Sequence, residues 1–153
     1  MIPLPRPVAG LVPHAGSMCL LDQVIECGDD HIVCSAVSHR SPNNPLRDAG
    51  RLSVSAAIEY AAQAMAAHGA LCAAAAGGAI EPRPGMLVAT RGVTFAIDAL
   101  DELTGALRVE ARALTRDPRG LVYDFSVDCA GAPIATGRLT VALSPRAPRR
   151  VER

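Results

Sequence analysis

Residues 53–76 have the sequence SVSAAIEYAAQAMAAHGALCAAAA. This stretch predicts one long helix, because alanine, its commonest residue, has the highest helix propensity. Ser53 or Ser55 can accept hydrogen bonds from the free N–H groups at the helix start, and Gly77-Gly78 is typical of a helix end. At a rise of about 1.5 Å per residue the helix would be about 36 Å long. Almost every face of it is apolar, so we expect other elements to cover it on both sides.

The second half of the chain alternates apolar and polar residues with the period of two that is typical of half-buried strands. The alternation predicts strands over residues 107–113, 123–129 and 138–143. A less regular strand runs from about 86 to 97, where Arg91-Gly92 indicates a bulge. The turn sequences DPRG at 117–120 and AGAP at 130–133 are short enough for antiparallel hairpins.

The segment before the helix predicts further strand structure. Residues 17–27 favour either a hairpin or a short helix that leads into a strand, followed by a turn at 28–30, a strand over 32–37 and a loop over 41–50. One strongly curved antiparallel sheet around a single long helix accommodates all these elements. The sequence therefore predicts an α+β fold.

Length and charge narrow the class of protein. The 153 residues fit one domain, which we assign to 1–145, and an arginine-rich tail follows at 146–153. Fifteen positive and fifteen negative charges balance, which argues against a nucleic-acid-binding protein. We interpret the tail as solvated, and the alternative is a docking patch for an acidic carrier protein.

The chain shows no sequence signal for export, membrane insertion or a metal. The first residues are interrupted by prolines, unlike a signal peptide, and the longest apolar stretch contains Gln63 and His68, which disfavours a membrane span. We therefore expect a cytoplasmic protein. The five cysteines have no C-x-x-C spacing, which argues against a zinc ribbon, and we expect no metal or redox cofactor.

The few polar residues of the helix are the first candidates for a site. Ser55, Glu59 and Gln63 are four residues apart and so share one narrow stripe of the helix. A carboxyl group among alanines and an isoleucine is costly to bury as a carboxylate, and its neutral form suits a general acid. We therefore expect Glu59 to be the acid and Gln63, one turn on, to orient it.

Two of the four histidines are candidates for a base. His14 precedes a turn of small residues and could point into a pocket, and His39 closes a strand just before the loop. We interpret His31 as a solvated turn residue and His68 as packed beside the sheet.

With these residues identified, the chain resembles the hotdog-fold 3-hydroxyacyl-(acyl carrier protein) dehydratases, especially the divergent members of aryl-polyene pigment clusters. The resemblance lies in LVPHAGSMCLLDQV at 11–24, which is similar to the family's L-P-H-x-x-x-x-L-L-D-x-V opening, and in AIEYAAQA at 57–64, which is similar to its helix E-x-x-x-Q. It implies a hotdog fold and a substrate carried on the phosphopantetheine of acyl carrier protein or coenzyme A. It also implies that a helix acid from the other subunit, matching Glu59, acts on the leaving hydroxyl. An N–H at the helix start, here at Ser53, Val54 or Ser55, would polarise the thioester carbonyl.

The chain differs from the family at the residue that acts as the catalytic base. Where the family has a histidine in a G-H-F-P loop, the matching spacing reaches Asn44-Pro45-Leu46-Arg47. We therefore expect His14 to remove the proton, with His39 as the second candidate and Asn43 or Asn44 as orienting groups.

Three functions remain open at this point. The first is a 3-hydroxyacyl dehydratase, the second is an acyl thioesterase of the same fold, and the third is a non-catalytic subunit that completes a heterodimer or holds the carrier protein. A sheet that wraps one helix leaves an edge strand open, so we expect either a homodimer or a heterodimer with a related hotdog subunit. The acyl tunnel would then run between the subunits.

Overall fold

The computed structural model describes residues 3–80 and 82–144. The arginine-rich tail predicted at 146–153 lies outside the described residues, so its role stays a prediction. The described part of the chain contains no helix long and apolar enough to cross a membrane.

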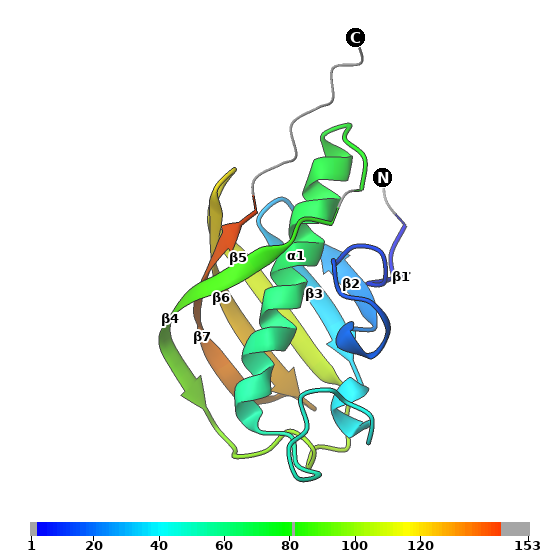
Figure 1. Cartoon of the computed structure of the whole chain (residues 1–153), viewed down its shortest axis with the longest axis vertical. Coiled ribbons are helices and arrows are strands. Elements are labelled where there is room, and N and C mark those ends of the chain that lie inside the picture. The colour runs from blue at the N-terminus through cyan, green and yellow to red at the C-terminus, as the bar shows by residue number, and fades with distance from the viewer. Residues whose placement is uncertain (1–2, 81, 145–153) are drawn as a thin grey trace.

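Seven strands form a single sheet in which every neighbouring pair is antiparallel (Figure 1). The order across the sheet is β1-β2-β3-β5-β6-β7-β4. The strands with their bounds are β1 Arg6–Pro7, β2 Gln23–Cys27, β3 His31–Ala36, β4 Gly85–Phe95, β5 Leu107–Asp117, β6 Gly120–Cys129 and β7 Ala132–Leu143. The predicted strands are thus present, and the turns at 117–120 and 130–133 join β5, β6 and β7 as hairpins.

The segment before β2 combines both predicted alternatives. A 3-10 helix, η1 (Gly16–Met18), leads towards β2, and β2 and β3 then form a hairpin that the Gly28 N–H closes on the His31 carbonyl. A second 3-10 turn, η2 (Ser38–Arg40), follows β3.

The long helix begins later than the sequence predicts. Residues Val54–Ala56 form a 3-10 turn, η3, and the α-helix α1 covers Ala57–Ala75. The Ser53 hydroxyl accepts the Ser55 N–H, so the predicted serine cap is present but acts on η3. Gly77, with φ of +90°, ends α1, where the Gly78 N–H bonds to the Ala73 carbonyl in a Schellman arrangement.

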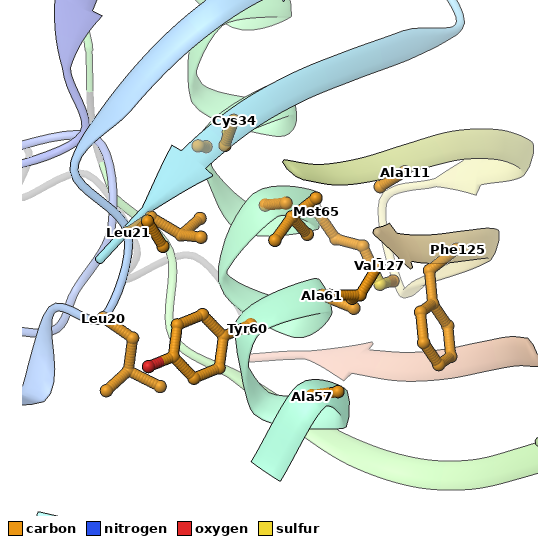
Figure 2. Close-up of a cluster of buried hydrophobic side chains, with 14 of the residues drawn as sticks. Leu20, Leu21, Cys34, Ala57, Tyr60, Ala61, Met65, Ala111, Phe125 and Val127 are labelled. Carbon is orange, nitrogen blue, oxygen red and sulfur yellow. The ribbon is translucent and has the colours of Figure 1, made fainter. Parts of the chain in front are cut away.

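The core lies between α1 and one face of the sheet. Figure 2 shows Tyr60, Ala61 and Met65 of the helix facing side chains from the sheet and from the segment before β2. The alternation predicted for the strands places Val109 and Val127, among others, in this core.

The expectation that α1 is covered on both sides is wrong for one stripe. Ala62, Ala66, Gly69 and Ala73 are only half-buried, whereas the residues between them are mostly buried. This stripe is the continuation of the face that carries Glu59.

Strand β4 forms an exposed edge of the sheet. It pairs with β7 on one side and has no other strand beside it among the described residues. Met86 is 69% exposed and Val88 is 55% exposed. The register shifts between Arg91 and Thr94, where the sequence predicts a bulge. An apolar edge of this kind is a surface on which another strand can pair.

Candidate active site

Glu59 and His14 are in contact at the first turn of α1. Nε2 of His14 lies 3.3 Å from Oε1 of Glu59, and the two side chains are 29% and 37% exposed. Both side chains are therefore half-buried. Nδ1 of His14 is buried and has no hydrogen-bond partner among the described residues. The structure thus brings together the two side chains that the sequence nominates as acid and base.

Gln63 positions the segment that carries His14. Its Oε1 accepts the Leu20 N–H at 2.8 Å, and its Nε2 donates to the Met18 carbonyl at 2.7 Å. Both polar ends of the amide are therefore engaged with the main chain, and Gln63 does not orient Glu59 as predicted. It instead links Met18 and Leu20, which follow His14 by four and six residues, to α1.

A cleft of about 740 Å³ runs along the half-buried stripe of α1. His14 and Glu59 line one part of it. Three elements form much of the remainder. They are small residues of α1 (Ala62, Ala66, Gly69 and Ala73), two apolar residues of β7 (Val141 and Leu143) and the start of β4 (Gly85 and Leu87). A cleft with an apolar lining suits a hydrocarbon chain.

A shallower groove of about 340 Å³ also has Glu59 in its lining. Ser53, Ser55 and Ile58 line it together with Glu59. Glu59 therefore lines both the groove and the cleft.

The N–H groups at the helix start are largely engaged. The Val54 N–H donates to the Asp98 carbonyl at 3.0 Å, and the Ala56 N–H donates to the Ser53 carbonyl at 3.0 Å. The Ser55 N–H has a longer bond of 3.3 Å to the Ser53 hydroxyl. The Val54 N–H is thus not free for a thioester carbonyl, whereas Ser53 and Ser55 both line the groove beside Glu59.

Asn44, the first residue of the stretch that the family's spacing reaches, has a structural role. Its Nδ2 donates to Tyr60 and to the Ser38 carbonyl, and its Oδ1 accepts the Leu46 N–H. The Tyr60 hydroxyl in turn contacts the Ser38 hydroxyl, which donates to the Leu20 carbonyl. Asn44 is outside the cleft lining, and Asn43 is exposed, so neither orients the predicted site.

His39 does not reach the candidate site either. It is fully buried, with Nε2 on the Leu103 carbonyl at 3.1 Å, and it is outside the cleft lining. Burial lowers the pKa of His39 below its ordinary value, so the neutral form is favoured.

His68 lies where the sequence predicts, whereas His31 is a half-buried strand residue and not a solvated turn residue as predicted. His68 is buried against the sheet and contacts the Tyr123 hydroxyl and the Gly28 carbonyl, and burial lowers its pKa. His31 begins β3 and lies near the carboxylates of Glu26 and Asp30 at the surface. The described residues contain no cluster of three side chains that could hold a metal ion.

Comparison with known proteins identifies the family. A family model described as "ApeP-like: ApeP dehydratase" matches residues 6–151. The chain belongs to the ApeP-like dehydratase family. The dehydratase heterocomplex ApeI:P from Xenorhabdus doucetiae contains a chain that is 27% identical, with 92% of this chain and 93% of that chain covered and a TM-score of 0.81.

More distant structures share the fold of this ApeP-like chain. A conserved protein from Pseudomonas aeruginosa is 21% identical, with 90% of this chain and 100% of that chain covered and a TM-score of 0.59. A hypothetical thioesterase with coenzyme A from Streptococcus pneumoniae is 12% identical, with 82% and 87% covered and a TM-score of 0.53. No curated protein matches by sequence. The predicted α+β hotdog fold is thereby confirmed.

Several residues of the cleft carry no signal in the sequence. Arg83 and Arg116 line its far end, although they lie 33 residues apart in the chain. Nothing in the local pattern around either arginine indicates a site, because their proximity follows from the pairing of β4, β5, β6 and β7. Only the topology brings them together.

Proposed function

We propose that this ApeP-like chain is one subunit of a cytoplasmic dehydratase that removes water from a 3-hydroxyacyl thioester. The substrate is carried on the phosphopantetheine arm of acyl carrier protein or on coenzyme A, in a polyene-type or fatty-acid pathway. The contact of His14 Nε2 with Glu59 Oε1 at the apolar cleft carries the proposal. Membership of the ApeP-like family supports it.

The pair can perform both proton transfers of the elimination. Nε2 of neutral His14 takes the proton from C2, the C3–O bond breaks, and the carboxylic acid of Glu59 gives its proton to the departing hydroxyl, which leaves as water. A C2–C3 double bond remains. The pair is then imidazolium and carboxylate, and one proton transfer across the 3.3 Å contact restores it. The reaction involves no net oxidation or reduction, so we propose no redox cofactor.

A second subunit fits two features of the chain. With a free lone pair on Nε2, His14 carries its proton on Nδ1, which is buried and has no acceptor among residues 3–80 and 82–144. An acceptor from a partner would hold that form of the ring. The exposed apolar edge at β4 offers the pairing surface. The related chain from Xenorhabdus doucetiae belongs to a heterocomplex, and we propose a related hotdog partner here.

The test is product analysis with this chain, a candidate hotdog partner and their mixture. A 3-hydroxyacyl thioester on carrier protein is supplied, and the conjugated enoyl thioester and free thiol are both measured. We expect the enoyl product from the mixture and little from either protein alone. Free thiol as the main product would establish the thioesterase alternative, and enoyl formation by the partner alone at the rate of the mixture would overturn the catalytic role of this chain.

A further inference from the structure

The end of the cleft far from Glu59 carries two guanidinium groups. Arg83 and Arg116 line it beside Asp117, close to Ala76, which follows the last residue of α1. In Figure 1 the β5–β6 turn and the last turn of α1 lie at the same end of the molecule. Between this end and Glu59 the helix contributes only alanine, glycine, methionine and cysteine to the lining. The cleft is thus apolar along the helix and charged at its far end.

Main-chain carbonyls hold both guanidinium groups in place. Nη2 of Arg83 donates to the carbonyls of Pro118 at 3.1 Å and Ser144 at 2.6 Å, and Nη2 of Arg116 donates to the Asp29 carbonyl at 2.9 Å. Nε of Arg83 is buried and has no partner among the described residues. Arg83 is therefore held by two bonds and Arg116 by one, and within the described residues both keep donors that are free for a ligand.

Neither arginine has a carboxylate partner in the described part of the chain. Four other arginines do, namely Arg51, Arg108, Arg112 and Arg138. Asp117 is adjacent in sequence to Arg116, but its Oδ1 accepts the Arg119 N–H. Arg83 is half-buried and Arg116 and Asp117 are exposed, so two positive charges and one negative charge leave a net positive charge at this end of the apolar lining.

We propose that Arg83 and Arg116 form a subsite for an anionic group on the substrate, an inference that rests on the proposed function. The helix rises about 1.5 Å per residue, so the 17 residues from Glu59 to Ala76 separate the two ends by about 25 Å. The ligand is therefore a linear molecule with its reacting carbons at Glu59 and a carboxylate or phosphate at its end. Planar guanidinium groups recognise both anions through paired hydrogen bonds.

Two parts of the substrate could supply this anion. One is a carboxylate at the far end of the acyl chain, and the other is the phosphate of the pantetheine arm. The apolar lining of α1 favours the acyl chain, because the amides of a pantetheine arm would find few hydrogen-bond partners there. The groove at Ser53 and Ser55 offers hydroxyl groups to that arm instead.

Binding of four unreactive thioether ligands to the complex of this chain with its partner tests the proposal. The ligands are S-alkyl pantetheines with or without the phosphate, and with a methyl or a carboxylate at the alkyl end. We expect the anion that reaches the subsite to tighten Kd by about tenfold or more, and added salt to reduce that gain. A gain from the carboxylate identifies the acyl end, and a gain from the phosphate identifies the arm.

Variants assign the gain to the two arginines. R116Q removes a guanidinium group that makes one bond to the main chain. R83K keeps the positive charge of Arg83 but lacks the planar guanidinium group. R119Q is the control, because Arg119 belongs to the same turn but does not line the cleft. We expect R116Q and R83K to lose most of the gain and R119Q to keep it. An equal Kd for all four ligands, or a gain that R116Q and R83K both retain, would overturn the subsite. Enoyl formation from a methyl-terminated substrate is followed in parallel, so a failed subsite and a failed dehydratase are told apart.

Discussion

The amide of Gln63 lies against the main chain of Leu20, whose N–H it accepts at 2.8 Å, 43 residues away in the sequence. The same amide donates to the Met18 carbonyl. These two bonds hold the segment that follows His14 against the helix that carries Glu59. The helix and the opening motif of the ApeP-like chain are thus linked through a buried side chain one helical turn after Glu59.

Replacement of Gln63 should affect both stability and turnover. Q63A leaves a buried N–H and a carbonyl without their partner, so we expect the free energy of unfolding to fall by about 2 kcal/mol or more. We also expect slower enoyl formation, because His14 is no longer held beside Glu59. Chemical denaturation and turnover measure the two effects. Q23A is the control, because Gln23 is an exposed glutamine of β2. Unchanged turnover in a folded Q63A protein would remove Gln63 from the positioning of the site.

Asn44 and Asn43 form a matched pair for a stability measurement. N44A removes three hydrogen bonds to buried or half-buried groups, and we expect a loss of about 2 kcal/mol. N43A alters an exposed side chain and should change the free energy of unfolding by less than about 0.5 kcal/mol. Denaturant titration of both variants checks this. Equal losses would contradict the structural role assigned to Asn44.

Sequence patterns within one helix or strand predict this fold well, but they do not predict contacts between elements that are distant in the sequence. The period-two alternation around Val109 and Val127 predicts strands that are present, and the alanine-rich stretch predicts α1. The helix start is displaced because the Val54 N–H pairs with the Asp98 carbonyl, 44 residues away, which no local pattern encodes. The partners of Gln63 were missed for the same reason.

The residues of the candidate site were likewise predicted only in part. Glu59 and His14 were nominated from their local surroundings, and the fold places them in contact. His39 was nominated on the same kind of reasoning but packs into the Leu103 loop instead. The role of the first pair in catalysis stays a prediction.

Acid should weaken the fold through buried His68. Burial is the main cause that lowers its pKa from the ordinary value of 6.5, with Arg116 and His31 acting in the same direction and Asp30 and the Gly28 carbonyl opposing it. The unfolded chain then binds the proton more tightly than the folded chain. The stability due to neutral His68 is therefore full above about pH 6.5 and is lost as the pH falls below that value.

The variant H68Q cannot titrate at this position. We expect it to be less stable than the wild type at pH 7.5, because its contacts with Tyr123 and Gly28 are lost, but to lose less stability between pH 7.5 and pH 5.5. Buried His39 remains in both proteins and contributes equally. Thermal unfolding at the two pH values measures the difference. A loss in H68Q as large as in the wild type would show that His68 is not the titrating group.

A charge on the open edge should separate the proposed subunits. V88E places a carboxylate on exposed β4, and we expect the affinity for the hotdog partner to fall by about tenfold or more while the isolated chain keeps its Tm. I25E, at an exposed apolar residue of β2, is the control. Analytical ultracentrifugation of the mixtures provides the readout. If I25E weakens the complex and V88E does not, the partner binds elsewhere.

The single-turnover rate of enoyl formation by the complex that contains E59Q tests the central proposal most directly. The chain offers a matched control in E26Q, because Glu26 also contacts a histidine, His31 at 3.2 Å, but lies at the surface of β2. We predict that E59Q lowers the rate by about 100-fold or more with an unchanged Tm, and that E26Q has the wild-type rate. A wild-type rate in the folded E59Q complex would contradict the account.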